Sequence, residues 1–531
     1  RNWQISIMAF QAIILCGPGS SFPTFTANPD ETPKALLPIA NRPMVWYPLE
    51  FCYRMGVTNI TLITPPSSAP AITTALNTNP HLTGLPLPKP DLLAPKDLDN
   101  TTGTAEIFRL PEVRDVVKGD FIILPCDLVC ELGGDALLEA WMVTQASLGG
   151  STPNQNGLGH PKMALNGEKA GRRGGMSVCY DTRGETIIKG EETDFIATTP
   201  LKAGPVPPPK SSVLSQLSNL VMSMPTDTLK DLTEKGGKLS IRHSLLEAHS
   251  RVRMLGSHRD AHIYIFPAWV MDMINSNDRM DSIGEDVIGW WAKAGWQDGL
   301  GEKLGLAEIF NSSSSPASHD DNLLDNPSTQ DESSFSTLSS TWTTPIQKQA
   351  DVKPRLIIPP ILTYQHPTPT PLIRRVDTAP LLLSVSLQLA KLEPTETGGT
   401  SPLTHPRKIA YPAGIASRTT VTRPDCLLAE NVTVEERCSL KECVVGAGCQ
   451  IKAGAKLTRC VLMDGVVVGN GCKLTGCVVG KRAELGEDCT LVDCEVQENL
   501  LVEAGSEEKG AKLMSSQGME ATEEELEEEL A

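Results

Sequence analysis

The C-terminal part of the chain carries an aliphatic repeat with a fixed period of 17 residues. Leu, Ile or Val recurs at intervals of 6, 6 and 5 residues, four times in succession and then begun again. The fourteen positions are Leu428, Val434, Leu440, Val445, Ile451, Leu457, Leu462, Val468, Leu474, Val479, Leu485, Leu491, Val496 and Val502. At an aliphatic frequency of ~25–30 %, chance would fill fourteen chosen positions about once in ten million trials or less. The repeat therefore predicts a stack of similar coils.

Each coil is expected to hold three short strands, and each strand points one aliphatic side chain into a narrow prism. Gly446, Gly469, Gly480 and Gly486 directly follow such inward positions, where a tight corner favours a residue without a Cβ. This is the pattern of a parallel β-helix built from hexapeptide repeats, which we place at residues 409–503. Its left-handed turn is inferred from resemblance to hexapeptide proteins, since the general crossover rule would give a right-handed one.

Nine of the fourteen cysteines lie inside this repeat, between Cys426 and Cys494. Two sets share a register of the 17-residue coil: Cys443, Cys460, Cys477 and Cys494, and Cys438, Cys472 and Cys489. The spacing favours small apolar thiols stacked in the interior. Zinc or disulfides are the alternative, but no Cys-x-x-Cys pair or histidine cluster accompanies these residues. We therefore predict no metal site.

The first 310 residues alternate short apolar runs with helical patterns, which is typical of βαβ units and a parallel sheet. Strands are expected at 12–16, 59–63 and 120–125, helices at 44–55 and 69–76, and a strand leading into a helix at 261–274. We predict an α/β Rossmann-like domain at 8–310. Surface insertions are expected at about 147–175, which is rich in Gly and Lys/Arg, and at about 201–235, which begins with a Pro-rich run.

The segments between and after these domains are poorer in apolar residues. Eleven Ser occur in residues 311–345, so 311–352 is expected to be a disordered insertion. Residues 353–408 are interpreted as a connector with a helix at 379–392. From Glu503 onward, ten acidic and two basic residues contribute −8 of the net charge of −17. We expect residues 504–531 to form a disordered acidic tail, which is either solvated or contacts a basic partner surface.

Charge and hydropathy exclude two classes of function. A net charge of −17 argues against sequence-specific binding of nucleic acid, which requires clustered Lys and Arg. No apolar run approaches the ~18 residues of a membrane span. The N-terminus also lacks the basic and apolar segments of a secretion signal. A cytosolic protein that does not cross a membrane is expected.

A second motif lies near the N-terminus. Gly17 and Gly19 follow an apolar strand, as in loops that hold phosphates. Lys34 comes fifteen residues later, in the string Thr-Pro-Lys-Ala-Leu-Leu-Pro-Ile-Ala-Asn-Arg-Pro-Met. This string resembles that of the sugar-phosphate nucleotidyltransferase family. By the same resemblance, Gly103 opens the segment that contacts the base, and Asp127 occupies the place of an aspartate that binds magnesium.

The motif also departs from that family. The loop is one residue shorter, Ser21 stands where the family has Arg, and Pro18 removes an N–H donor. The sugar-phosphate lysine and a second magnesium carboxylate are also missing. Joining two anionic substrates requires magnesium and fixed cations. We therefore predict no catalytic residue and no cofactor, and interpret the matching residues as a vestigial nucleotide pocket: Gly17, Gly19, Lys34, Gly103 and Asp127.

Active mannose-1-phosphate guanylyltransferases combine the same two domains, so architecture alone does not decide the function. The altered loop and residues 239–246, 260–264 and 440–446 resemble the gamma subunits of eukaryotic translation initiation factor 2B. The resemblance implies a non-catalytic subunit of the guanine-nucleotide exchange factor for translation initiation factor 2. Such a subunit pairs with a catalytic epsilon subunit on a core of alpha, beta and delta subunits and promotes GDP release. The alternatives are a mannose-1-phosphate guanylyltransferase or its nucleotide-sensing regulatory subunit.

Overall fold

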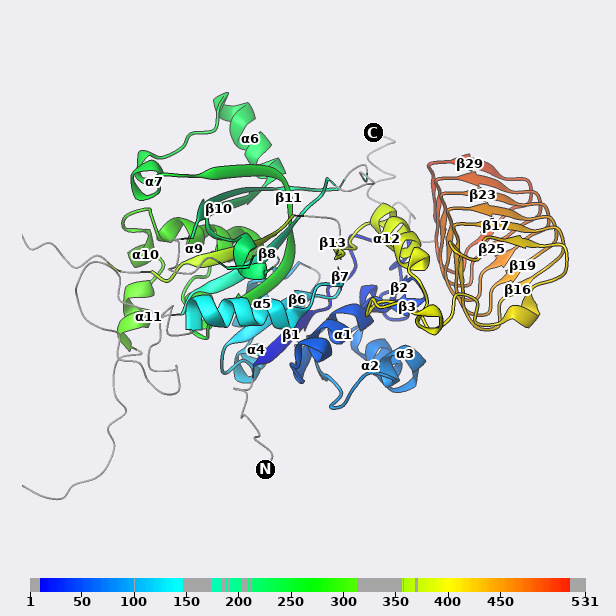
Figure 1. Ribbon diagram of the computed structural model, residues 1–531, viewed down its shortest axis with the longest axis horizontal. Coiled ribbons are helices and arrows are strands. Elements are labelled where there is room, and N and C mark those ends of the chain that lie inside the picture. The colour runs from blue at the N-terminus through cyan, green and yellow to red at the C-terminus, as the bar shows by residue number, and fades with distance from the viewer. Residues whose placement is uncertain are drawn as a thin grey trace, which may run out of the picture.

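The computed structural model describes residues 10–99, 101–146, 173–183, 188, 191–201, 208–209, 212–312, 356, 358–367 and 371–515. Most of the insertion expected at 147–175 and of the Ser-rich segment at 311–352 lies outside these ranges. An α/β body and a prism of short strands lie next to each other (Figure 1). In the part of the chain that is described, no helix is both long and apolar enough to cross a membrane.

The α/β body is built on a nine-stranded sheet with the strand order β5-β4-β1-β6-β11-β8-β12-β10-β9. Four of these strands are parallel to one another: β1 (Gln11–Leu15), β4 (Asn59–Ile63), β5 (Asp91–Leu93) and β6 (Phe121–Pro125). Strands β1, β4 and β6 are almost continuously buried, as expected where helices cover both faces of a parallel sheet. The predicted Rossmann-like α/β fold is confirmed.

The other half of the sheet is mixed, and its strands come from distant parts of the chain. It contains β8 (Gly175–Asp181), β9 (Asp194–Pro200), β10 (Leu217–Pro225), β11 (Arg253–Phe266) and β12 (Ile361–His366). Strand β10 falls inside the insertion expected at 201–235, and β12 falls inside the connector expected at 353–408. Both are full members of the sheet, because β12 pairs with β8 and β10. Pairings this remote in sequence leave no local pattern.

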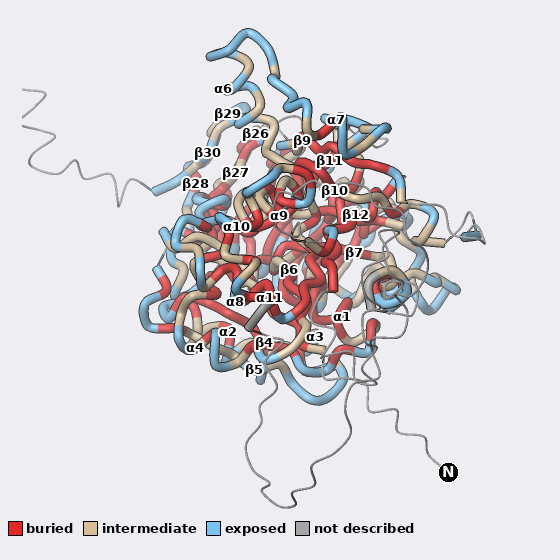
Figure 2. Tube along the Cα trace, turned by 90° about the vertical axis from the view of Figure 1, so that its left-hand side faces the viewer, coloured by how far each residue is buried: buried red, intermediate tan, exposed pale blue. Residues whose placement is uncertain are grey.

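Helices cover both faces of this sheet. They are α1 (Trp46–Met55), α2 (Ala69–Thr78), α3 (Pro80–Thr83), α4 (Pro111–Val116), α5 (Gly134–Trp141), α6 (Thr226–Gly236), α7 (His243–Ala248), α8 (Trp269–Asn275), α9 (Ile288–Ala294), α10 (Leu300–Lys303) and α11 (Leu306–Ser312). Ile14 belongs to the core that includes Phe51 of α1. The neighbouring Ile13 belongs to the opposite core, which includes Trp291 of α9. Buried residues follow the strands between these layers (Figure 2).

The C-terminal body is a parallel β-helix with three sheets, in agreement with the predicted left-handed type. One sheet contains β14 (Thr420–Val421), β17 (Ser439–Lys441), β20 (Lys456–Thr458), β23 (Lys473–Thr475), β26 (Thr490–Val492) and β29 (Glu507–Lys509). The second contains β15 (Leu427–Leu428), β18 (Val444–Val445), β21 (Val461–Leu462), β24 (Val478–Val479), β27 (Glu495–Val496) and β30 (Lys512–Leu513). The third contains β16 (Thr433–Val434), β19 (Gln450–Ile451), β22 (Val467–Val468), β25 (Glu484–Leu485) and β28 (Leu501–Val502).

The aliphatic ladder lies in the interior of this β-helix. Leu440, Leu457, Leu474 and Leu491 pair in succession, and all fourteen repeat positions are buried. The β-helix extends beyond its expected end at 503, because β29 and β30 pair with β26 and β27. Glu508 stands where the pattern would place an aliphatic residue, but it is exposed. Because the residues of β29 are exposed, this last coil does not require an aliphatic side chain there, and the aliphatic pattern ends.

Two further features of the β-helix depend on contact between coils. A Cβ on Gly469 would lie 2.4 Å from the carbonyl oxygen of Gly486, so this glycine is required by the closeness of the next coil. The cysteine thiols also reach the next coil, as where Cys472 Sγ donates to the carbonyl oxygen of Gly486 at 3.0 Å. All fourteen cysteines are free and buried. Within the described ranges, no group of three His, Cys, Asp or Glu side chains is arranged to hold a metal ion.

Helix α12 (Ala379–Lys391) lies between the two bodies (Figure 1). It contacts β2 (Pro38–Ile39) on one side and β18 and β21 of the β-helix on the other. Its Leu381 and Val385 share one apolar core with Ile39 of the α/β body and Val461 of the β-helix. The connector therefore joins the two bodies through a continuous hydrophobic core.

Candidate functional site

The candidate site lies at the carboxyl ends of β1 and β6, the edge where α/β sheets bind ligands. Because β1 and β6 are parallel neighbours, the loops that follow them meet. The first loop contains Gly17 and Gly19, and the second contains Asp127. Lys34 begins a single 3-10 turn (Lys34–Leu36), and its Nζ lies 2.7 Å from Asp127 Oδ2. The structure thus brings Lys34 and Asp127 together.

A third charged residue at this site, Arg375, was not predicted from the sequence. It ends β13 (Ile373–Arg375), which pairs antiparallel with β7 (Leu128–Cys130), directly after Asp127. Arg375 Nε lies 3.7 Å from Asp127 Oδ1, on the side of the carboxylate that Lys34 leaves open. The adjacent Arg374-Arg375-Val376-Asp377 string was the available signal. The pairing of β13 with β7 is what brings Arg375 of this string next to Asp127.

Arg375 connects Asp127 to a wider buried network. Its Nη1 donates to His262 Nε2 at 3.1 Å, and its Nη2 lies 3.6 Å from Asp377 Oδ2. Arg259 on β11 donates to the same Asp377 oxygen at 2.5 Å and lies 3.8 Å from Glu191. With Lys34 and Asp127, the cluster contains three cations and three carboxylates. Its formal charges therefore balance without an external ion.

The pKa shifts follow from burial and from these neighbours. Burial alone would raise the pKa of Asp127, but the charges of Lys34 and Arg375 outweigh it and hold the pKa well below its usual range. Burial opposes the charged form of Lys34, yet Asp127 raises its pKa. Burial and then the Arg375 charge lower the pKa of His262. His262 is therefore neutral, which allows its Nε2 to accept the hydrogen bond from Arg375.

These residues do not fit the magnesium ion that the nucleotidyltransferase resemblance implies. Asp127 is only 2 % exposed, and its two oxygens face Lys34 and Arg375. A divalent cation at this carboxylate would therefore lie beside two fixed positive charges. No second carboxylate completes a metal-binding group among the residues described at this edge of the sheet. The Asp127 carboxylate is bound instead by cations of the same chain.

The glycine loop forms a tight turn. Gly19 has a φ of 90°, and a Cβ there would lie 2.9 Å from Thr26. The Thr26 hydroxyl and the Phe22 amide both donate to the Gly19 carbonyl oxygen at 2.8 Å. Phe22 is buried, and its ring lies 5.9 Å from Lys34 Nζ. The loop therefore brings an aromatic ring toward Lys34. A Cβ on Gly17 would meet no atom within 4 Å.

Gly103 packs against a segment of the α/β body that precedes α9. A Cβ on Gly103 would lie 2.2 Å from the Asp281 carbonyl oxygen, so only glycine fits. The Ala105 amide donates to that same oxygen at 2.9 Å, and the Ile283 amide donates to Thr104 Oγ1 at 3.0 Å. These contacts give the predicted base-contacting segment a packing role.

The second half of the lysine motif contributes to the interface between the two bodies. Strands β2 and β3 (Arg42–Pro43) form a hairpin whose turn residues, Ala40 and Asn41, have φ angles of 45° and 63°. The Ala40 amide donates to Ser386 Oγ of α12 at 3.1 Å. Asn41 Nδ2 donates to the Val445 carbonyl oxygen of the β-helix at 3.0 Å. The string that resembles a nucleotide site therefore also joins the two bodies.

Comparison with known proteins gives matches that agree with these observations. Residues 422–506, which form most of the β-helix, match the GMPPB C-terminal domain. The chain is similar to translation initiation factor eIF2B subunit gamma of Schizosaccharomyces pombe. The two are 25% identical over 316 residues, which make up 59% of this chain. The alignment covers 58% of that relative, so less than two thirds of its length is matched. The matches support the combination of a nucleotidyltransferase-like domain with hexapeptide repeats.

Proposed function

We propose that this chain is a non-catalytic, regulatory subunit of the guanine-nucleotide exchange factor for translation initiation factor 2. The observation that carries the proposal is the pairing of Asp127 with Lys34 and Arg375. A transferase needs that carboxylate for magnesium, whereas here it is buried and neutralised. Similarity to eIF2B subunit gamma supports the identity of the complex. The residues Gly17, Gly19, Lys34, Gly103 and Asp127 are then remnants of a nucleotide pocket.

In this function, the chain acts through its surfaces. It pairs in the cytosol with an epsilon-type subunit, which catalyses exchange, on a core of alpha, beta and delta subunits. Exchange accelerates when the complex stabilises the nucleotide-free state of the GTPase, because a partner shifts an equilibrium only by binding one state more tightly. The rigid β-helix and the joined α/β body suit a scaffold, since neither has to rearrange for chemistry.

Co-purification tests this proposal. The full chain carries a tag and is expressed in its own cells, and the recovered proteins are identified and quantified. We expect an epsilon-type subunit and the core subunits in fixed ratio, and faster GDP release from initiation factor 2 when the chain is present. Recovery of a homo-oligomer alone, or exchange that is independent of the chain, would contradict the proposal.

The match to the GMPPB C-terminal domain favours a second candidate, a mannose-1-phosphate guanylyltransferase or its nucleotide-sensing subunit. The purified chain is incubated with GTP, magnesium and mannose 1-phosphate, and pyrophosphate is measured. Release that depends on Asp127, tested with Asp127→Asn, would favour the enzyme. Calorimetric binding of GTP or GDP-mannose without turnover would favour the sensing subunit. Neither signal is expected from an exchange-factor subunit.

A further inference from the structure

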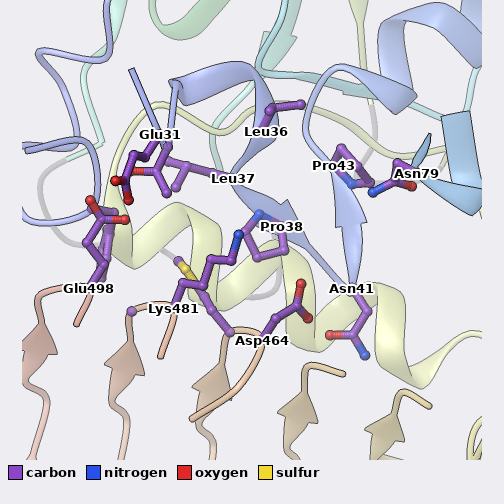
Figure 3. A pocket seen from close by; sticks show the side chains of 14 residues that line it. Glu31, Leu36, Leu37, Pro38, Asn41, Pro43, Asn79, Asp464, Lys481 and Glu498 are labelled. Carbon is purple, nitrogen blue, oxygen red and sulfur yellow. The ribbon is translucent and has the colours of Figure 1, made fainter. Parts of the chain in front are cut away.

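A pocket of about 100 Å³ lies where the β-helix meets the α/β body (Figure 3). Neither Lys34 nor Asp127 lines it. Its walls come from both bodies: Glu31 and Leu37 belong to the first, and Asp464, Lys481 and Glu498 to the second. Because a cavity of about 150 Å³ accepts benzene, the space suits a group of a few non-hydrogen atoms. This pocket is independent of the proposed exchange-factor function.

Glu498 gives the pocket an unsatisfied polar atom. Its side chain lies in the wall of the pocket, where Figure 3 shows its carboxylate facing that of Glu31. Glu498 is only 5 % exposed, and its Oε1 has no hydrogen-bond partner among the described residues. Burial, followed by the charge of Glu31, raises the pKa of Glu498, while Thr32, Lys481 and Arg482 oppose this shift. A buried acceptor without a donor is unfavourable, so the site favours a ligand that supplies one.

The charges around the pocket indicate whether the ligand is positively or negatively charged. Glu31 and Asp464 are exposed and line the pocket together with the buried Glu498. Lys481 is the single basic residue among the lining side chains that the structure describes. Arg482, next to the pocket, lies 3.4 Å from Glu31. Three carboxylates therefore face two basic side chains, and the one negative charge left over attracts a cation. These carboxylates are not grouped closely enough to hold a metal ion in the described structure. An organic cation fits this arrangement.

The remaining walls are apolar. Phe25 and Leu37 are buried in the α/β body, and Met463 is buried on the β-helix side. These side chains can cover a short hydrocarbon chain, while the polar groups fix its charged end. Methionine also adapts its shape readily to a bound group.

We propose that this pocket binds a small organic cation, whose ammonium or guanidinium group donates to Glu498 Oε1 while its hydrocarbon part contacts Phe25 and Met463. Because the two sides of the pocket belong to different bodies, the ligand holds the β-helix against the α/β body. Binding to the folded state alone also raises the melting temperature, and the rise grows with the logarithm of ligand concentration above the dissociation constant.

The test uses n-butylammonium as the probe, with n-butanol and butyrate as neutral and anionic probes of similar size. Binding to the full chain is measured by calorimetry and by the shift in melting temperature. The substitution Glu498→Gln removes the charge and keeps the side-chain shape. Its matched control is Glu484→Gln. Glu484 is exposed on β25 of the β-helix and does not line the pocket.

We expect butylammonium to bind the wild-type chain and Glu484→Gln equally, and to bind Glu498→Gln about tenfold more weakly. Butanol and butyrate should not raise the melting temperature. If Glu498→Gln does not fold, Glu31→Gln tests the same site at an exposed position, where severalfold weaker binding is expected. Equal binding to the glutamine variants, or absence of butylammonium binding, would overturn the proposal. N-acetyl-lysine methylamide, which mimics a lysine residue of a protein, is tested alongside. If it binds and butylammonium does not, the pocket accepts a lysine of a partner protein, and the proposal of a small organic cation is overturned.

Discussion

Arg375 Nε lies 3.7 Å from Asp127 Oδ1, which joins β13 to the loop that follows β6. Asp127 is buried and Arg375 is partly buried, with side-chain exposures of 2% and 15%. A buried charge is costly when its partner is removed, because neither water nor another ion compensates it. The contact therefore holds β13, which leads from β12 of the mixed half of the sheet to α12, against the loop that contains Asp127.

Replacing Arg375 by Met should destabilise the protein strongly. The substitution removes one counter-charge of Asp127 and the donor to His262. We expect a loss of about 3–5 kcal/mol in the free energy of unfolding, as for other broken buried pairs. Urea unfolding followed by circular dichroism measures the change. The control is Arg423→Met at an exposed position, where less than about 0.5 kcal/mol is expected. Equal effects at the two positions would show that the pair does not stabilise the fold.

The interface between the two bodies depends on Ser386 of α12. Its hydroxyl accepts a hydrogen bond from the Ala40 amide at 3.1 Å, and both residues are buried. Ser386→Ala should cost about 1–3 kcal/mol, because the amide loses its partner without gaining water. Ser384→Ala, on the same helix but only partly buried, is the control. Thermal unfolding measures both variants, and limited proteolysis between the bodies should increase only for Ser386→Ala. A Ser386→Ala chain that is as stable as Ser384→Ala would contradict this role.

The fold was largely predictable because its strongest signals are local. The 17-residue spacing of Leu440, Leu457 and Leu474 can be read directly from the sequence. In the structure these residues pair in register on successive coils. The strand at β1 follows from an uninterrupted apolar run. Strand β12 could not be predicted as a sheet member, because its partners β8 and β10 are remote in sequence. Strand β10 pairs with β9, the strand before it, and was missed because the Pro-rich run between them indicated a surface insertion.

The site was predictable only in part. Lys34 and Asp127 were expected together from the resemblance to nucleotidyltransferases, and the structure places them 2.7 Å apart. Arg375 was missed, because an arginine in a connector gives no indication of which carboxylate it will meet. Glu498 was missed for a similar reason: it falls between aliphatic ladder positions, where exposed residues are usual. Its burial depends on the α/β body that covers this part of the β-helix.

A carboxylate pair on β9 and β11 should make stability depend on pH. Asp194 Oδ2 accepts from the Asp260 amide at 2.7 Å, and the Tyr264 hydroxyl donates to Asp260 Oδ2 at 2.5 Å. Burial and then the charge of Asp194 raise the pKa of Asp260 to about 7. The folded state therefore binds a proton that the unfolded state releases near pH ~4. Stability from this group is fully present below that pH and is lost as the pH rises to about 7.

Asp260→Asn should remove this pH dependence. The asparagine oxygen can accept from the His262 backbone amide, which donates to Asp260 Oδ1, and its NH2 group can donate to the Tyr264 hydroxyl oxygen, which faces Oδ2. The side chain does not ionise. We expect the variant to match the wild type near pH 4 and to exceed it at pH 8 by up to about 4 kcal/mol, at ~1.4 kcal/mol for each unit of pKa difference. Urea unfolding between pH 4 and pH 8 measures the difference. Parallel curves for the two proteins would mean that Asp260 titrates normally.

The cysteine ladder should protect its thiols from reagents. All fourteen cysteines are buried, and burial raises the pKa of Cys460 to about 12. Since the thiolate is the reactive form, native protein should react slowly with Ellman's reagent at pH 8, and all fourteen thiols should react after guanidinium unfolding. Rapid labelling, in the native protein, of any of the nine thiols between Cys426 and Cys494, located by mass spectrometry, would contradict a closed ladder. Zinc remains testable in the same samples. A metal-stabilised β-helix would lose thermal stability on addition of a chelator, whereas a ladder held by aliphatic packing and thiol-to-carbonyl hydrogen bonds should unfold at an unchanged temperature.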